Sequence, residues 1–172
     1  MAMILGMSTS TFTLFHVILS LIGIGAGLVV LFGLLSSRRL DGWTAVFLVT
    51  TVSTSVTGYF FPRDQVLPSH IVGAISLAIL AVAIVALYGY RLARSWRWIY
   101  VASAVVALYL NVFVAIVQTF LKVPFANALA PTQKEPPFLI AQVAVLLIFI
   151  VLGIMAVRSF QPGSRAPALS QA

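Results

Sequence analysis

Hydrophobic residues in this chain form five long runs without charge, and all charged side chains lie in the segments between and beyond them. Each run has close to the roughly 20 residues that an α-helix needs to cross about 30 Å of hydrocarbon. Irregular backbone would leave unpaired amides in lipid, so helices are expected throughout. The pattern predicts an all-α integral membrane bundle of five transmembrane helices. Their expected positions are residues 12–35, 43–61, 70–90, 99–121 and 138–157.

Composition supports the same class of protein. Hydrophobic residues make up 62% of the chain and charged residues 8%, whereas about a quarter of the residues in soluble domains are charged. Residues 1–158 are therefore expected to form a single transmembrane domain. Residues 159–172 are rich in Pro, Ser, Ala and Gln. They hold too few apolar side chains to pack, and we expect them to be a disordered cytoplasmic tail.

The basic residues are shared unevenly between the two ends of the expected bundle. One set of connections, together with the C-terminal tail, holds seven of the ten lysines and arginines: Arg38, Arg39, Arg91, Arg94, Arg97, Arg158 and Arg165. By the positive-inside rule this set is cytoplasmic, which predicts an outside N-terminus and a cytoplasmic C-terminus. The net charge of +7 is then an orientation signal in a membrane protein and not a sign of nucleic-acid binding.

The kinds of residue present exclude several kinds of chemistry. Without cysteine the chain cannot form a disulfide, a thiolate metal site or a covalently attached c-type haem. The sequence contains no Walker loop, GxSxG or HExxH motif, so phosphate, acyl-transfer and zinc-protease chemistry lack support. Whether the protein is an enzyme stays open at this level.

Polar residues of the expected helices gather at one depth. Because successive helices alternate in direction, the first ends of helices one, three and five meet the last ends of helices two and four in the outer leaflet. Six polar side chains fall in this layer: His16, Thr57, Tyr59, His70, Gln118 and Gln142. Polar groups in hydrocarbon turn into the bundle and find partners. They predict a polar pocket in the outer half of the bundle, whereas the inner half is expected to be dry.

The longest connection, residues 122–137, is expected to cover this pocket as a loop lid that includes Lys134 and Glu135. Glu135 is followed by two prolines, which suits a helix start because proline fits the first turn and a carboxylate favours the positive dipole end. Asp64 and Glu135 are the nearest carboxylates by topology and the candidates for a third metal ligand. No spacing motif links them to the histidines, so both are more simply explained as loop residues.

Two kinds of ligand fit the polar side chains. His16 and His70 could bind the iron of a b-type haem from opposite faces, which is the sharpest chemical hypothesis. The alternative, which is the more common use of such residues, is that each imidazole hydrogen-bonds a neighbour or relays protons. Gln118 and Gln142 could hold a quinone carbonyl, or they could bond to each other and join their helices.

The run Thr57-Gly58-Tyr59, the loop residue Pro62 and then His70 at a helix start resemble the layout of small, uncharacterised bacterial multi-pass inner-membrane proteins. The resemblance covers the second and third helices. It implies haem binding, which is suspected for some of those proteins. The string at residues 130–138, Ala-Pro-Thr-Gln-Lys-Glu-Pro-Pro-Phe, looks like a family signature without an assigned activity.

These observations lead to one hypothesis of function and two alternatives. The hypothesis is a membrane protein that binds a redox cofactor, haem or quinone, in the outer-leaflet pocket. One alternative is a non-enzymatic accessory or assembly protein whose polar residues only hold helices together, and the other is a small-molecule or ion carrier. The expected partners are the lipid bilayer and either a quinone or another membrane protein. A homo-oligomer is left open, and nucleic acid is excluded.

Overall fold

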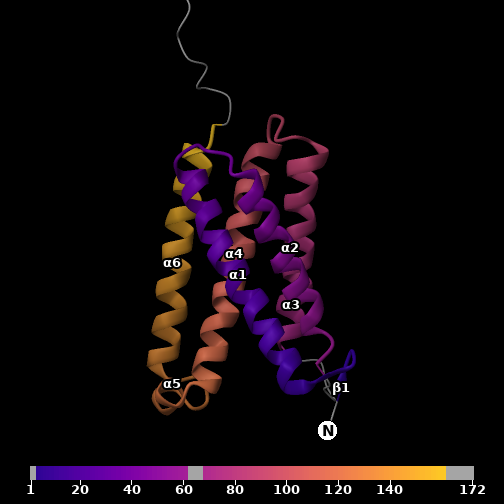
Figure 1. The fold of residues 1–172 in the computed structure, drawn as a ribbon. Coiled ribbons are helices and arrows are strands. Elements are labelled where there is room, and N and C mark those ends of the chain that lie inside the picture. Colours follow the sequence, from indigo (N-terminus) through magenta and orange to yellow (C-terminus); the bar gives the residue numbers. More distant parts are fainter. Residues whose placement is uncertain (1–2, 62–67, 162–172) are drawn as a thin grey trace, which may run out of the picture.

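A computed structural model of the protein describes residues 3–61 and 68–161. Within these ranges long helices form a bundle, and their axes run in the same general direction (Figure 1). The elements in chain order are β1 (Met3–Ile4), β2 (Met7–Ser8), α1 (Thr9–Leu35), α2 (Asp41–Gly58), α3 (Pro68–Ile84), η1 (Val85–Gly89), α4 (Trp96–Lys122), α5 (Pro124–Leu129) and α6 (Pro136–Ser159). Apart from one short hairpin the fold is all-α, as the apolar runs predict.

Four helices in the described ranges are long and apolar enough to cross a membrane: α1, the continuous stretch His70–Gly89, α4 and α6. These helices mark the protein as a membrane protein. The helix α2 is not among them, because its 18 residues begin with Asp41 and include seven serines and threonines. A fifth crossing by α2 stays a prediction. Each of the five long helices begins two or three residues before its expected position.

The third helix ends differently from the expectation. Its α-helical part stops at Ile84 and continues as the π-helical turn η1, which closes with a bond from the Tyr90 amide to the Val85 carbonyl at 3.0 Å. Arg91, Leu92 and Arg94 then adopt positive φ angles of 48°, 61° and 48°. These left-handed residues reverse the chain within a few positions, so that α4 begins directly beside the end of α3.

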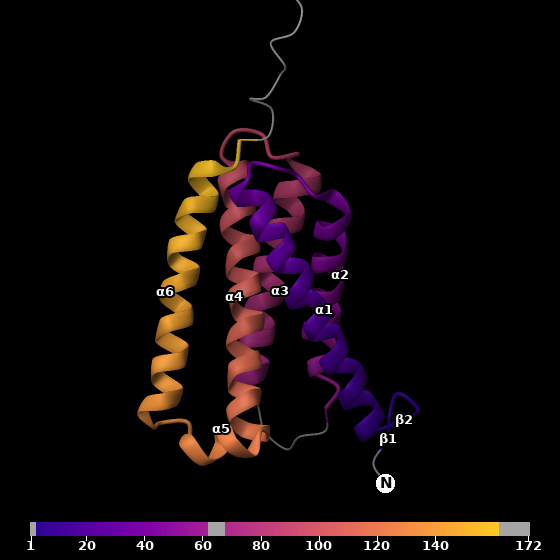
Figure 2. The ribbon, with the colours of Figure 1, turned by 60° about the vertical axis from the view of Figure 1, so that its left-hand side comes forward.

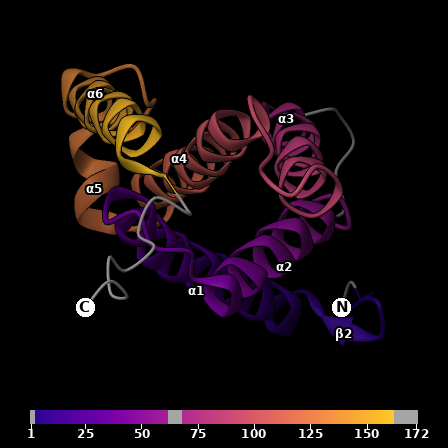
Figure 3. The ribbon, with the colours of Figure 1, turned by 90° about the horizontal axis from the view of Figure 1, so that it is seen from above.

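The helices α1, α2, α3 and α4 form a ring when the bundle is seen from above (Figure 3). The last long helix, α6, lies outside this ring against α4 and α1, and the short helix α5 connects it to α4. Only 11% of the apolar stretch of α6 is buried, compared with 39% for α1 and α4. The sixth helix is therefore peripheral, and the ring is the centre of the fold.

The two ends of the bundle differ in charge. The connections α1–α2 and η1–α4 and the end of α6 lie at one end, opposite the N-terminal hairpin (Figure 2). We call this the arginine-rich end, because it holds Arg38, Arg39, Arg91, Arg94, Arg97 and Arg158. The opposite end is where α1 and α3 begin and α2 and α4 end. We call it the cavity end, because a cavity described in the next section lies in this half of the bundle. Arg165, the expected tail beyond residue 161, and residues 62–67 with Asp64 lie outside the described residues.

Residues 3–8 form a small hairpin in which Met3 pairs with Ser8 and Ile4 with Met7. Its turn residues Leu5 and Gly6 both have positive φ, at 51° and 80°. Two consecutive positive φ angles are the geometry of the tight turns that suit the twist of a hairpin. Ser8 then caps α1, since its hydroxyl accepts a hydrogen bond from the Thr11 amide at 3.2 Å.

The arginine-rich half of the ring is filled by apolar side chains. Gly27 of α1 lies so close to α4 and α2 that an added Cβ would come within 2.6 Å of Leu108 Cδ1 and 2.9 Å of Phe47. Leu80, Ala83, Val101 and Ala104 complete this core from α3 and α4. One polar pair lies there against expectation, because Thr44 and Tyr100 are buried with their hydroxyls 3.5 Å apart.

Candidate functional site

A cavity of about 540 Å³ lies inside the ring, in the half that belongs to the cavity end. All four ring helices contribute to its wall, so it is enclosed by the fold and not by a single loop. Its polar lining consists of Thr13, His16, Ser20, Thr54, Ser55, Tyr59, His70, Ser76, Asn111, Gln118, Thr119 and Lys122. The structure thus brings together His16, Tyr59, His70 and Gln118, as the shared depth of these residues predicts.

His16 is held in a defined chemical state by Thr57. The His16 Nδ1 atom lies 2.8 Å from Thr57 Oγ1. The Thr57 hydroxyl donates to the Ser53 carbonyl at 2.7 Å, and a hydroxyl has a single hydrogen to give. Thr57 therefore accepts from Nδ1–H of His16. In the neutral imidazole this leaves the lone pair on Nε2, the nitrogen that can accept a hydrogen bond or bind a metal.

The neighbours of His16 fix its ring. Phe61 contacts it edge-on, with ring centroids 5.3 Å apart. An added Cβ at Gly58 would lie 3.8 Å from His16 Cε1, so the ring packs close to α2 and leaves room there for a methyl group in ordinary contact. Thr57 belongs to the site through its bond to His16 and not as part of the cavity wall.

Tyr59 and His70 join the end of α2 to the start of α3. The Tyr59 hydroxyl donates to the His70 carbonyl at 2.7 Å, and the two rings are stacked with centroids 5.4 Å apart. Tyr59 Oη would lie 3.3 Å from a Cβ at Gly73, so the tyrosine needs the glycine beside it. This contact places the second imidazole at the rim of the cavity.

The floor of the cavity is a cluster of buried polar groups near the middle of the ring. Asn111 donates from Nδ2 to Thr51 Oγ1 at 3.2 Å. An added Cβ at Gly23 would lie 3.2 Å from the hydroxyls of Thr50 and Thr51, so the α1 backbone approaches the cluster closely. The sequence signals for this cluster are the helical spacing of Thr50, Ser53 and Thr57 in α2 and the position of Asn111 near the middle of α4. Ser76 also lines the cavity, and nothing in the sequence indicated this position.

Two oxygen atoms in the cavity wall have no hydrogen-bond partner within the described part of the chain. They are Thr54 Oγ1 and Gln118 Oε1, both buried. Burying a hydroxyl or amide without a partner costs about 1–3 kcal/mol in protein mutational data. Buried polar atoms of this kind in native proteins are commonly satisfied by ordered water or a ligand. Both residues line the cavity, so this unused hydrogen-bonding capacity belongs to side chains of its wall.

Gln142 lies outside this cavity. It is buried on α6, and its Nε2 donates to the Phe113 carbonyl of α4 at 3.3 Å. The alternative in which Gln118 bonds to Gln142 is not found, because Gln118 faces the ring while Gln142 packs on the outer side of α4. Gln142 thus joins α6 to α4. Of the two glutamines only Gln118 lines the cavity.

The connection between α4 and α6 does not close over the cavity with Lys134 and Glu135. Only Lys122 and Val123 of this connection line the wall, and α5 lies beside α4 and α6, outside the ring (Figure 3). Gln133 Nε2 donates to the Val117 carbonyl at 2.9 Å, and Asn127 Nδ2 donates to the Phe120 carbonyl at 3.0 Å. These bonds satisfy carbonyls near the end of α4, so the connection acts as a cap for that helix.

Glu135 is the centre of the last turn before α6. Its carboxylate accepts hydrogen bonds from the Thr132 hydroxyl at 2.8 Å, the Thr132 amide at 3.2 Å and the Lys134 amide at 3.0 Å. Desolvation raises the pKa of Glu135, but the hydrogen bonds from Thr132 and Lys134 outweigh it and lower the pKa below its usual value. Glu135 therefore organises its own turn and reaches no cavity residue.

The cavity suits a neutral or anionic ligand with hydrogen-bonding groups. Lys122 is its one charged residue among the lining residues described, and none of them is a carboxylate. The described residues include no group of three His, Cys, Asp or Glu side chains that could hold a metal ion. His16 and His70 remain the two side chains that could bind haem iron. A third carboxylate ligand from Asp64 falls outside the described residues, and Glu135 is engaged elsewhere.

No protein-family model, curated protein or solved structure matches this chain. The resemblance of residues 57–70 to small bacterial multi-pass proteins stays a prediction. The site has to be interpreted from its own geometry.

Proposed function

We propose that this protein is a bacterial inner-membrane protein that binds a small redox-active ring, a quinol or quinone, in the cavity of the α1–α4 ring. The observation that carries the proposal is that two residues lining one cavity, Thr54 and Gln118, each have a buried side-chain oxygen without a partner among the described residues. In a lipid-embedded bundle such groups stabilise the protein only when a partner is present. A ligand with hydroxyl and carbonyl groups on an apolar ring supplies such partners.

The chemistry of the wall favours a quinol in particular. Gln118 Oε1 can only accept a hydrogen bond, and the Nε2 of neutral His16 is also an acceptor. These acceptors come from α4 and α1, two neighbouring helices of the ring. A quinol has two hydroxyl donors, one for each. The Thr54 hydroxyl can donate to the carbonyl of the oxidised form, so the same wall accommodates both redox states.

The proposed topology has five crossings, with the N-terminus outside and the C-terminus in the cytoplasm. The fifth crossing by α2 is supported by its outward face, where Trp43, Val46, Val49 and Val56 are exposed, while Thr44, Thr50, Thr51 and Thr54 are buried. The orientation is supported by the arginine-rich end, since basic residues collect on the cytoplasmic side. The cavity end then faces the extracytoplasmic side. Reporter fusions that place both termini in one compartment would overturn this topology.

Co-purification tests the quinone proposal. Protein extracted from quinone-replete membranes should retain quinone that organic extraction and chromatography can quantify. The variant Gln118→Leu removes the unpaired acceptor at similar volume, and we expect bound quinone to fall about tenfold, as for loss of one to two kcal/mol of hydrogen bonding. Gln142→Leu is the matched control, because it removes the same side chain outside the cavity and should leave retention unchanged.

The control also defines the outcome that contradicts the proposal. Equal retention by wild type and Gln118→Leu, or a loss confined to Gln142→Leu, would show that the cavity does not hold the quinone. Protein free of quinone and of colour, with mild effects from changes of either histidine, would instead support the accessory or assembly role.

A b-type haem is the second candidate, and the specific observation in its favour is that two imidazoles line the same cavity. His16 has the arrangement common for metal-binding histidines, in which one ring nitrogen bonds to the protein and the other is free. The visible spectrum of detergent-purified protein before and after dithionite tests this candidate. A Soret band that vanishes in both His16→Ala and His70→Ala would support it, and a flat spectrum after haem-replete expression would remove it.

A further inference from the structure

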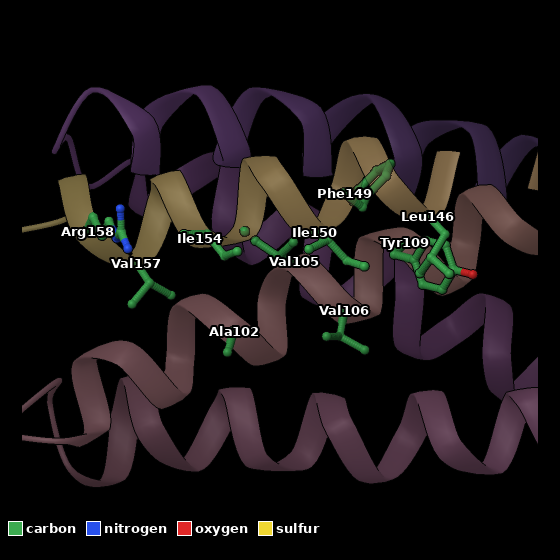
Figure 4. A pocket seen from close by; sticks show the side chains of 11 residues that line it. Ala102, Val105, Val106, Tyr109, Leu146, Phe149, Ile150, Ile154, Val157 and Arg158 are labelled. Atoms are coloured by element: carbon green, nitrogen blue, oxygen red, sulfur yellow. The ribbon is translucent and has the colours of Figure 1, made fainter. Parts of the chain in front are cut away.

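A second hollow lies on the outer surface of the bundle, in the groove between α4 and α6. Its volume is about 360 Å³. Ala102, Val106 and Tyr109 form its α4 side, and Ile150, Ile154 and Arg158 belong to its α6 side. Arg158 lies at one end of the groove, with Tyr109 and Leu146 towards the other (Figure 4). The groove shares no residue with the cavity inside the ring.

We propose that this groove is a binding site for an anionic glycerophospholipid, with one acyl chain lying along α4 and α6 and the phosphate paired with Arg158. The groove wall is apolar and faces outward, since Val106, Ile150 and Ile154 are between 40% and 49% exposed. That surface belongs to two helices long enough to span the bilayer, so the molecules around it are lipids.

Arg158 supplies the charge complementarity that selects the headgroup. It lies in the last turn of α6 and makes no ion pair within the described residues. A guanidinium binds phosphate oxygens through two parallel hydrogen bonds, which gives geometry as well as charge. Because Arg158 belongs to the arginine-rich end, the phosphate would lie at headgroup depth while the chain runs towards the membrane centre.

Contacts with other helices hold the end of α6 in place, so the groove is pre-formed. Phe160 is fully buried, and its ring lies 6.3 Å from that of Tyr100 on α4. The Gln161 amide donates to Ser37 Oγ at 2.9 Å, which ties the end of α6 to the α1–α2 connection. A pre-formed site loses less conformational freedom on binding than a mobile one.

Charge, and not the apolar fit, should decide which lipid occupies the groove. An acyl chain gains little by leaving the bilayer for a protein groove, because lipid tails are as apolar as the side chains that replace them. One arginine near an anionic headgroup corresponds to about a fivefold preference over a zwitterionic lipid. The site should therefore discriminate between phosphatidylglycerol and phosphatidylcholine and discriminate poorly between chains.

Native mass spectrometry of the detergent-purified full chain, mixed with phosphatidylglycerol or phosphatidylcholine, tests the proposal. We expect wild type to retain phosphatidylglycerol about fivefold better, and Arg158→Gln to lose this preference. Arg94→Gln is the control, because it removes an exposed arginine from the same end of the bundle away from the groove. Val106→Trp, an exposed position in the groove wall, should lower retention of both lipids.

Three outcomes would overturn the proposal. The first is equal retention of the two lipids by wild type, which is the behaviour of ordinary surrounding lipid. The second is an equal loss of preference in Arg94→Gln and Arg158→Gln, which assigns the effect to the whole basic end. The third is a dimer mass without bound lipid, which would mean that a second copy covers the groove.

Discussion

The cavity end and the arginine-rich end are built from the same four helices, yet one encloses a cavity and the other is filled. The difference lies in what faces the small residues. Gly27 faces Phe47 and Leu108, so large side chains occupy the space that the glycine leaves. At the cavity end Gly58 and Gly73 lie among hydroxyls, amides and imidazoles of the wall. The glycine in the arginine-rich half is thus covered by large apolar side chains, whereas the glycines at the cavity end belong to the cavity wall.

The same comparison applies to polar groups. In the middle of the ring Thr51 and Asn111 bond to each other, and at the arginine-rich end Thr44 lies beside Tyr100. In the cavity wall Thr54 Oγ1 and Gln118 Oε1 are buried without a partner in the described residues. A side chain that only joins helices needs its partner on another helix. Gln142 Oε1 is also buried without a partner in the described residues, but only Thr54 and Gln118 belong to the cavity wall, where a ligand could supply the missing hydrogen bonds.

The largest expected effect comes from adding a methyl group to the filled half. Gly27→Ala would place a Cβ 2.6 Å from Leu108 Cδ1, and overpacking of this kind destabilises by about 1–3 kcal/mol. Unfolding in detergent, followed by circular dichroism, measures the loss. Gly25→Ala on the same helix meets nothing within 4 Å, and Gly58→Ala makes only an ordinary contact at 3.8 Å. Equal midpoints for all three variants would contradict the packing difference.

A smaller effect should distinguish Thr51, which bonds to Asn111, from Thr54, whose hydroxyl has no partner within the described residues. Thr51→Val leaves the Asn111 amide without its bond and should cost about 1–2 kcal/mol of unfolding free energy. Thr54→Val removes a buried hydroxyl that has no partner in the part of the chain that the structure describes, so ligand-free protein should keep its stability or gain up to about 1 kcal/mol. Denaturant titrations of both variants in the same detergent provide the measurement. A larger loss in Thr54→Val than in Thr51→Val would show that the Thr54 hydroxyl is satisfied within the protein.

The smallest effect concerns the connection at the cavity end. The pKa of Glu135 is lowered from 4.5 in the folded protein, so the carboxylate stabilises the fold above the pKa of the unfolded chain and loses this contribution as pH falls through the folded pKa. Glu135→Gln should therefore be less stable than wild type at neutral pH, and the difference should shrink as the pH falls through the folded pKa of Glu135. Thermal unfolding at pH 7 and at pH 3.5 measures the two differences. A constant difference between these pH values would exclude the carboxylate as its cause.

The connections also show where sequence reasoning stops. Pro136 opens α6 and Pro124 opens α5, as the preference of proline for the first turn predicts. The function of the connection as a cap depends on Gln133 and Asn127 reaching carbonyls of α4. Side chains of loop residues can reach several acceptors, and the sequence does not rank them. For that reason only the structure could show that this connection caps α4 and does not cover the cavity with Lys134 and Glu135.

The sequence by itself determined that the protein is a helical membrane bundle, where its long helices lie, and at what depth the polar residues gather. Depth follows directly from a rise of about 1.5 Å per residue along helices of alternating direction. The tertiary structure decided which way each helix is rotated. Rotation turns Gln118 into the ring and brings Thr57 onto His16, whereas Gln142 stays outside because the whole of α6 packs on the outer side of α4. A single amphipathic period cannot specify rotation in helices that are apolar on nearly every face, because only contact with neighbouring helices fixes which side is inside.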